Sequence, residues 1–266
     1  MSGQVRLSRH GEHRHVAELV LDRPEALNAL STTFAAQLRD TLRDLATEAE
    51  SGAVRAVVLS SSRPRAFCVG ADLKERNTFT DADLRAQRVV YRAMTAAWRA
   101  LPVPAVAAVA GYAMGGGFEL ALWCDLIVVD TTAVLALPEV SVGVVPGLGG
   151  TQLLSRRVGL SRASDLIFTA RRIDAEQAMA LGAVDRVVAA GTARDVAIEL
   201  ASTIAGNSPV GVRNAKRALR TGFDVDLASG LEIEDGAWRA TAFSADRAEG
   251  VAAFVEKRSP NWPGVD

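Results

Sequence analysis

The stretch GYAMGGGFELALWCD, Gly111–Asp125, decides the fold of this chain. It follows the apolar segment Ala105–Ala110, which is typical of a buried strand, and it runs into a predicted helix over Gly115–Cys124. A glycine turn that enters a helix leaves backbone N–H groups without carbonyl partners, and these groups can bind an anion. Because Glu119 lies three residues beyond Gly116, one helical turn places its carboxyl on the same side as that amide.

A second glutamate belongs to a similar segment twenty residues further on. Glu139 opens the glycine-rich stretch ALPEVSVGVVPGLGG, Ala136–Gly150. Two carboxyl groups brought to one pocket raise the pKa of one of the pair, which leaves one acid and one base. Such a pair suits the addition or removal of water beside a carbonyl group.

Strand and helix patterns alternate on either side of these motifs. Ser31 is a candidate N-cap for a helix with apolar residues at helical spacing, and Asp81 is a candidate cap for another. Buried strands separated by helices predict an α/β fold with parallel pairing. The strands expected besides Ala105–Ala110 are Val16–Leu21, Arg55–Ser60, Leu126–Asp130 and Val134–Leu137.

The strand patterns stop near residue 192. From there the sequence predicts four helices, Thr192–Gly206, Pro209–Gly222, Leu227–Phe243 and Arg247–Lys257. We therefore expect an α/β core over residues 1–191 that holds the active site, and a helical oligomerisation region over residues 192–266. The helical region is expected to pack against the core or against neighbouring subunits.

Composition narrows the class of protein. The 266 residues carry a net charge of −1, whereas nucleic-acid and anionic-membrane binding usually need a basic field. The two cysteines cannot form a stapled framework, and no apolar run is long enough to span a membrane. The N-terminal segment lacks the apolar core of a signal peptide. A cytoplasmic enzyme with no nucleic-acid or membrane partner is expected.

Five motifs in register give the chain a family resemblance. They are LDRPEALNAL at 21–30, AFCVGADLKE at 66–75, the two glycine-rich stretches quoted above, and AEGVAAFVEKR at 248–258. Together they resemble the enoyl-CoA hydratase/isomerase (crotonase) family over nearly the whole chain. The resemblance implies a ββα spiral core, C-terminal helices that form a trimer, and a hexamer built as a dimer of trimers. It also implies an acyl-CoA thioester substrate with no metal or redox cofactor.

The same resemblance assigns four catalytic positions. The backbone amides of Ala71 and Gly116 match the oxyanion hole, which suits a reaction that builds negative charge on a thioester oxygen. Glu119 and Glu139 match the two catalytic glutamates of the hydratases. We assign the ionised base to Glu119 and the protonated acid to Glu139, although such a pair titrates as a unit.

Further positions resemble the parts of the family that contact substrate and coenzyme A. Val69, Gly70, Asp72, Leu73, Lys74 and Gly115 surround the two amide donors. Lys74 and Lys257, two of only three lysines, match positions that approach the CoA phosphates, Lys257 from an adjoining subunit. Phe254 lies one turn before Lys257 and matches either an adenine contact or a core position.

Several alternatives stay open. Having both glutamates favours an enoyl-CoA hydratase over an isomerase, and Gly147 stands where some relatives carry aspartate. Two motifs also resemble carnitinyl-CoA dehydratases, so a specialised acyl group is the alternative. A different class would be a non-catalytic scaffold that binds acyl-CoA or RNA.

Other conspicuous side chains are not expected to carry chemistry. His10, His13 and His15 have no carboxylate or cysteine cluster beside them, which argues against a metal site. Cys68 is expected to be a packing residue. Tyr91 and Trp98 form a helix stripe that faces the core or the acyl pocket, and the core is favoured.

Overall fold

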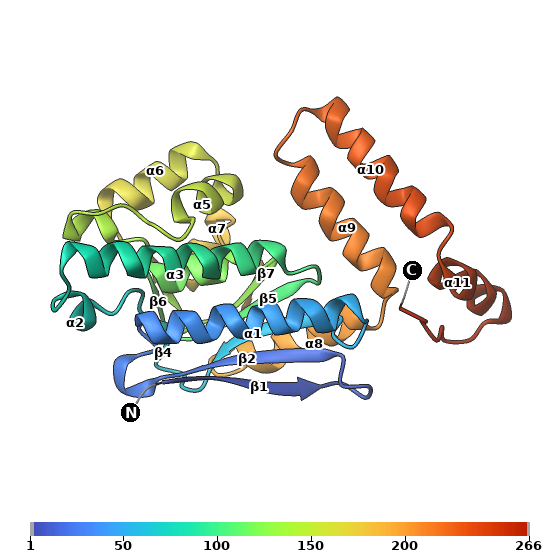
Figure 1. Ribbon diagram of the computed structural model, residues 1–266, viewed down its shortest axis with the longest axis horizontal. Helices are drawn as coiled ribbons and strands as arrows, with labels where there is room; N and C mark the ends of the chain where they lie inside the picture. Colours follow the sequence, from blue (N-terminus) through green and yellow to red (C-terminus); the bar gives the residue numbers. More distant parts are fainter. Residues whose placement is uncertain (1–2, 265–266) are drawn as a thin grey trace.

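The computed structural model of the chain describes residues 3–264 and contains two sheets (Figure 1). The larger sheet has the strand order β1-β2-β3-β5-β7-β10, and only the β1–β2 pair is antiparallel. Its strands are Gln4–His10, Val16–Asp22, Ala56–Ser61, Ala105–Val109, Leu126–Asp130 and Arg186–Val188. The prediction of an α/β fold with parallel pairing is confirmed.

The smaller sheet is built from short strands, and three of its four strands each follow a strand of the first sheet. Its order is β4-β6-β8-β9, with strands Ala66–Cys68, Tyr112–Met114, Val134–Ala136 and Ile173–Asp174. The chain thus passes from β3 to β4, from β5 to β6 and from β7 to β8, and each pair is followed by helix. This repeated β-β-α unit winds the two sheets side by side and brings the turns after β4, β6 and β8 together.

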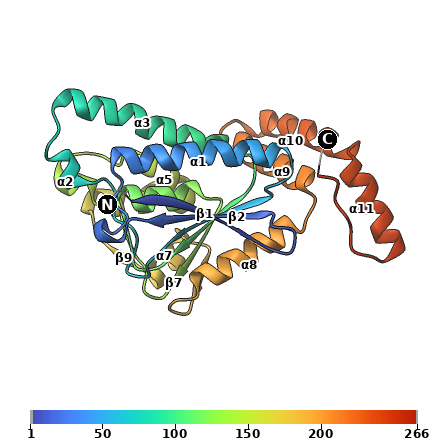
Figure 2. The same cartoon turned by 60° about the horizontal axis from the view of Figure 1, so that its bottom comes forward.

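Helices cover both faces of the larger sheet (Figure 2). On one face α1, Thr32–Glu50, packs against α3, Asp81–Ala100. On the other face α8, Ala193–Ala205, buries a row of alanines against β2, β3, β5 and β7. Ser31 caps α1 as expected, because its side chain accepts from the Phe34 N–H at 3.2 Å.

The remaining local elements place the site loops. They are the 3-10 turns η1, Pro24–Ala26, and η2, Glu139–Val142, and the helices α2, Leu73–Arg76, α4, Gly116–Trp123, α5, Gly150–Val158, α6, Leu160–Thr169, and α7, Ala175–Leu181. The cap predicted for α3 was wrong by one residue. Thr80 is the N-cap, in a reciprocal capping box with Asp83, and Asp81 is the first helical residue.

Three C-terminal helices project from the body of the molecule (Figure 1). They are α9, Pro209–Gly222, α10, Leu227–Ala242, and α11, Ala245–Glu256, close to the predicted ranges. The division expected at residue 192 stays a prediction. Helix α8 lies beyond that residue and packs on the larger sheet, whereas α9 to α11 project from it. Large apolar side chains on the projecting helices are exposed, among them Leu219, Phe223, Leu227, Leu231, Trp238, Phe243, Val251, Phe254 and Val255.

A buried carboxylate ties the projecting helices to the body. Asp246, which is only 2% exposed, accepts from the Ser208 hydroxyl at 2.6 Å and from the Val210 N–H at 3.2 Å. Its other oxygen accepts from the Gly264 N–H at 2.8 Å. The start of α9, the start of α11 and the C-terminal segment therefore meet at one side chain. No helix of residues 3–264 is long and apolar enough to cross a membrane.

Candidate active site

The three glycines that follow β6 are Gly115, the N-cap of α4, and the first two residues of that helix, and each lies at a close approach. Gly115 has φ 52°, and a Cβ there would lie 2.9 Å from Glu139 Oε1. A Cβ on Gly116 would lie 3.1 Å from the Leu148 side chain, and one on Gly117 would overlap the Cys68 carbonyl oxygen at 1.9 Å. The turn therefore lets helix α4 begin directly against the end of β4, with Glu139 beside it.

The loop after β4 brings Ala71 to the same turn. Gly70 has φ 87°, and a Cβ on it would lie 3.1 Å from the Gly116 nitrogen. The residues on either side of Ala71 pair with Leu30, because the Leu30 N–H donates to the Gly70 carbonyl at 2.7 Å and the Asp72 N–H donates to the Leu30 carbonyl at 3.0 Å. In such a parallel bridge the N–H of Ala71 itself points away from Leu30. The amides of Ala71 and Gly116 thus lie on adjacent backbone segments.

Glu119 lies on the first turn of α4 and is 1% exposed. Its Oε1 accepts two backbone N–H groups, from Leu148 at 2.6 Å and from Gly150 at 2.7 Å. Burial raises the pKa of Glu119 to about 7, and the nearby charge of Glu139 acts in the same direction. The two N–H bonds and the charge of Arg88 oppose the shift. The carboxyl therefore changes its charge near neutral pH.

Glu139 begins η2 and is partly exposed. Burial raises the pKa of Glu139 above its usual value. Its Oε2 is buried and has no hydrogen-bond partner among residues 3–264. Buried polar atoms are nearly always paired in folded proteins, so the unpaired Oε2 is a candidate contact for a ligand or a water.

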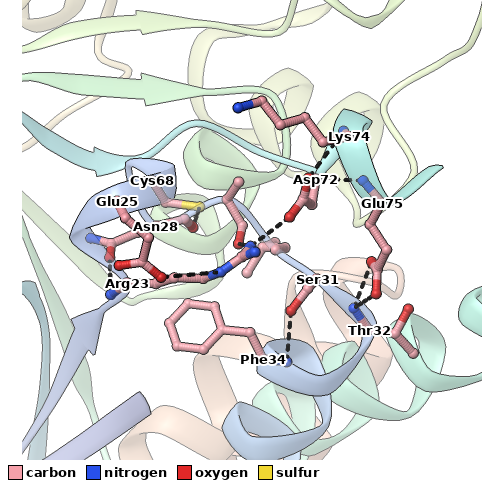
Figure 3. A network of polar contacts seen from close by, with 12 residues as sticks. Arg23, Glu25, Asn28, Ser31, Thr32, Phe34, Cys68, Asp72, Lys74 and Glu75 are labelled. Carbon is pink, nitrogen blue, oxygen red and sulfur yellow. Dashed lines mark hydrogen bonds and ion pairs between the residues drawn. The ribbon is translucent and has the colours of Figure 1, made fainter. Parts of the chain in front are cut away.

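Asp72 is occupied within its own loop (Figure 3). Its Oδ1 caps α2 by accepting from the N–H groups of Lys74 and Glu75, and its Oδ2 pairs with Arg23 at 2.7 Å. Arg23 also donates to the Ala29 carbonyl at 2.8 Å. The Asp72 side chain therefore fixes the loop beside Ala71, and its expected contact with substrate stays a prediction.

Lys74, two residues after Asp72, differs from it in the same view (Figure 3). The Lys74 side chain extends away from the polar network, and both Leu73 and Lys74 are exposed. Val69 is partly exposed beside buried Gly70. These four residues surround the Ala71 amide from β4 to α2, so the structure brings this group of predicted positions together.

Lys257 and Phe254 lie apart from the rest of the candidate site. They belong to the end of α11, while α2 lies at the opposite end of the molecule in both views (Figures 1 and 2). Phe254 is 85% exposed, so its alternative as a core residue was wrong. Within one chain neither side chain reaches Glu119. Their expected contact with CoA from an adjoining subunit stays a prediction.

Several contributors to the site were not found from the sequence. The amides of Leu148 and Gly150 bind Glu119, and the Trp123 ring N–H donates to the Leu148 carbonyl at 2.6 Å. Asn28 donates to the Phe67 carbonyl at 2.9 Å and so supports β4. A signal for Asn28 was present, since it lies in the motif at 21–30. Any residue type except proline can supply a backbone N–H, so the sequence does not mark Leu148 and Gly150 as donors. Trp123 has the pattern of an ordinary apolar helix residue.

The remaining conspicuous residues are structural. Cys68 donates to the Asn28 carbonyl at 3.0 Å, and burial raises the pKa of its thiol to about 12, so it is a neutral packing group. Tyr91 and Trp98 are buried, as favoured from the sequence. Residues 3–264 contain no group of three or more His, Cys, Asp or Glu side chains that could hold a metal ion.

Comparisons with known proteins place this geometry. The family model of enoyl-CoA hydratase/isomerase matches residues 11–265. The chain is 42% identical over 260 residues to "Enoyl-CoA hydratase domain-containing protein 2, mitochondrial" of Bos taurus, covering 96% of this chain and 86% of that protein. It is 37% identical over 257 residues to "Methylglutaconyl-CoA hydratase, mitochondrial" of Mus musculus, covering 95% and 81%.

A solved structure agrees with these matches. The crystal structure of an enoyl-CoA hydratase from Bacillus anthracis superposes with a TM-score of 0.93 at 38% identity, covering 98% of this chain and 99% of that one. The two-sheet spiral with C-terminal helices is therefore the crotonase fold, as the motifs implied. A whole-length family match and this structural agreement lead to one conclusion: the chain belongs to the enoyl-CoA hydratase/isomerase family.

Proposed function

We propose that this protein is an enoyl-CoA hydratase, which adds water reversibly to a trans-2-enoyl-CoA and gives the 3-hydroxyacyl-CoA by syn addition. One observation carries the proposal. Glu119 and Glu139 both lie beside the glycine turn, and each has a carboxyl oxygen that is not engaged by the protein: Glu119 uses Oε1 for both of its amide bonds, and Glu139 Oε2 has no partner among the described residues. Two such oxygens can hold one water between them.

The backbone donors supply the electrostatic part of the mechanism. Attack of water on the β-carbon moves an electron pair toward the thioester carbonyl oxygen and forms an enolate. In the proposed complex this oxygen accepts from the N–H groups of Ala71 and Gly116, and each such donor is typically worth about 3–4 kcal/mol in the transition state. Gly116 is also the first residue of α4, where the helix dipole favours negative charge.

The glutamates supply the proton transfers. The carboxylate of Glu119 takes a proton from the water as its oxygen bonds to the β-carbon. The carboxyl of Glu139 gives a proton to the α-carbon, so one proton enters and one leaves the pair in each hydration. A pKa of about 7 for Glu119 suits a base that works near neutral pH. Burial raises the pKa of both carboxyls, and the charge of Glu139 also acts on Glu119, so we expect the two groups to titrate as a pair.

The coenzyme part of the substrate is assigned to the lysines. Lys74, exposed on α2, is proposed to meet the CoA phosphates, and Lys257 to meet them from a neighbouring subunit of a trimer or a dimer of trimers. Phe254 would then lie against the adenine. The third lysine, Lys216, is buried and pairs with Asp125 at 3.0 Å, so it serves the fold. The proposed reaction needs no metal or redox cofactor, because all its proton and charge transfers fall to the residues named.

A hydratase of a specialised acyl group is the second candidate. One relative is named for methylglutaconyl-CoA, and two motifs resemble the carnitinyl-CoA dehydratases. Gly147 favours the general hydratase form. The presence of both glutamates disfavours an isomerase, which commonly keeps only the acid at the position of Glu139, and it disfavours a scaffold without activity.

The test is turnover of a panel of enoyl-CoA esters, measured as loss of the enoyl-thioester absorbance. The panel runs from short to long chains and includes crotonobetainyl-CoA and methylglutaconyl-CoA. Glu119→Gln and Glu139→Gln should each lower turnover by about 10²–10⁴-fold with little change in acyl-CoA binding. The double variant should lose far less than the product of the two. Hydration at the wild-type rate by either single variant would refute the mechanism.

A further inference from the structure

The loop at 146–150 is held in place by two helices. From α3, the Arg88 guanidinium donates to the Gly147 carbonyl, and from α4 the Trp123 ring N–H donates to the Leu148 carbonyl at 2.6 Å. Between these two anchors the loop presents the N–H groups of Leu148 and Gly150 to Glu119 Oε1. Both amide donors of the proposed base therefore depend on how this loop is fixed.

One peptide unit joins Arg88 to Glu119. The carbonyl of Gly147 and the N–H of Leu148 belong to the same planar peptide group. Arg88, which donates to the oxygen, and Glu119, which accepts from the N–H, therefore lie on opposite sides of this rigid group. Hydrogen bonds in such a chain polarise one another: a cation on the carbonyl strengthens the N–H as a donor. The contact from α3 thus reaches the carboxylate without touching it.

Gly147 has the residue type that this arrangement needs. A Cβ on Gly147 would lie 3.3 Å from Arg88 Nη1, which is tighter than an ordinary contact. Without that carbon the guanidinium reaches the carbonyl oxygen. Arg88 forms no ion pair with a carboxylate among residues 3–264, so its charge is not neutralised by a closer partner.

We propose that Arg88 is a positioning residue for the proposed general base: it holds the Gly147–Leu148 peptide so that its N–H donates to Glu119, and its charge favours the ionised form of that carboxylate. The proposal rests on the proposed hydratase function. The charges that act on Glu119 among the described residues are those of Glu139, from η2, and Arg88, from α3. On α3 the charged neighbours of Arg88 are Arg85 and Arg92, about one turn to either side.

The direction of the effect follows from the charges. The positive charge of Arg88 lowers the pKa of Glu119, against the burial that raises it. Removal of Arg88 should therefore keep Glu119 protonated to higher pH, and less of the base is available on the acid side of the pH profile. Because Arg88 is exposed, its charge is screened by solvent and the effect is modest.

The test is a series at Arg88 in the full-length chain. Arg88→Lys keeps the charge, Arg88→Gln keeps a neutral donor for the Gly147 carbonyl, and Arg88→Met keeps neither. Arg92→Gln, an exposed arginine one turn along α3, is the matched control. The measurement is kcat/KM against pH with a short enoyl-CoA, at low and at high ionic strength.

We expect Arg88→Gln to move the acid side of the kcat/KM pH profile to higher pH. Its kcat/KM should fall about 2- to 5-fold below neutral pH and keep the wild-type value at the alkaline plateau. Arg88→Met should show the same shift and a lower plateau, because the peptide is also released. Arg88→Lys and Arg92→Gln should keep the acid side of the wild-type profile. The gap between wild type and Arg88→Gln should narrow in high salt.

Two results would overturn the inference while the wild type is active: an Arg88→Gln profile that superposes on the wild type, or a change confined to KM for acyl groups that carry a carboxylate, which would place Arg88 on the substrate. A wild type inactive on every ester would instead refute the proposed function. The infrared band of the protonated Glu119 carboxyl, assigned with Glu119→Gln, would still test the inference in that case. It should persist to higher pH in Arg88→Gln than in the wild type.

Discussion

At the scale of single residues, ionisation of Glu119, which the proposed reaction needs, lowers the stability of the folded protein. Burial raises the pKa of Glu119 to about 7 in the folded chain, whereas the ordinary pKa of a glutamate side chain is 4.5, so the folded chain keeps this proton to higher pH than the unfolded chain. Stability from this proton is therefore full below pH 4.5 and is lost as the pH rises through 7. Deprotonation of a buried acid at working pH costs up to about 3 kcal/mol by this difference.

The expected result is that Glu119→Gln stabilises the protein at alkaline pH. The amide oxygen can still accept from Leu148 and Gly150, and no buried charge forms. The gain in melting temperature over the wild type should be largest near pH 8 and should vanish toward pH 5. Thermal unfolding at both pH values checks this. An equal difference at the two pH values would mean that Glu119 titrates as an ordinary carboxyl.

A second prediction at this scale concerns Gly115. Gly115→Ala places a Cβ 2.9 Å from Glu139 Oε1 and also strains a backbone at φ 52°. We expect turnover to fall at least about tenfold, because Glu139 must move, together with about 1–3 kcal/mol of lost stability from the strained backbone. Gly159→Ala is the control, since it also lies outside the left-handed helical region, at φ 83° and ψ 156°, and has no atom within 4 Å of an added Cβ. It should lose similar stability and keep its activity, and equal activity losses in both variants would contradict the contact.

At the scale of elements, the loop from β4 to α2 is the unit that carries the Ala71 amide. Asp72→Ala removes both the cap of α2 and the partner of Arg23, whereas Asp72→Asn keeps the cap and loses the charge. We expect kcat to fall about tenfold in Asp72→Ala and less in Asp72→Asn, with stability losses of about 1–3 kcal/mol in Asp72→Ala. Kinetics beside chemical unfolding measure the two effects separately.

The control for this prediction is another helix cap. Asp226 caps α10 by accepting from the Ser229 N–H at 3.1 Å, on the exposed side of the projecting helices. Asp226→Ala should lose a comparable cap energy without a fall in kcat. If Asp72→Ala keeps full turnover, the loop does not need this carboxylate to place its amide.

The sequence predicts the long elements of this fold well, and physical periodicity explains why. The helices over 209–222 and 227–242 have strong stops at glycine and serine, and buried strands such as 126–130 have continuous apolar runs. The short strands β4, β6 and β9 have two or three residues each and carry no period of their own. Their pairing depends on contacts between distant segments, which local patterns do not encode.

The candidate site divides in the same way. Residues whose type reports their chemistry, such as Glu119 and Glu139, were found from the motifs. Leu148 and Gly150 act through backbone N–H groups, so their side chains carry no signal. The roles of the residues in the site stay predictions until turnover is measured.

At the scale of the whole molecule, the projecting helices expose more apolar surface than a stable monomer usually carries. We expect assembly through this surface. Trp238→Glu, on α10, should therefore shift sedimentation toward smaller species, while Leu7→Glu on β1 should not. A wild type that sediments as a monomer and is fully active would contradict the assembly.

Lys257 provides the link between assembly and substrate. Lys257→Ala should keep the oligomer and raise KM for CoA esters several-fold at low salt, since an exposed charge contact is worth about 1 kcal/mol or less. The increase should shrink at high ionic strength. An unchanged KM at low salt would show that Lys257 does not contact the coenzyme.

The carboxylate at 246 has a further consequence for how variants of this protein would be interpreted. It lies at the start of α11 and accepts hydrogen bonds from the start of α9 and from the C-terminal segment. Asp246→Ala should let α9 and α11 change direction while their exposed apolar side chains are all retained. In a genetic screen, such an allele would look like a lesion in subunit recognition. Its cause would be the loss of hydrogen bonds within a single chain.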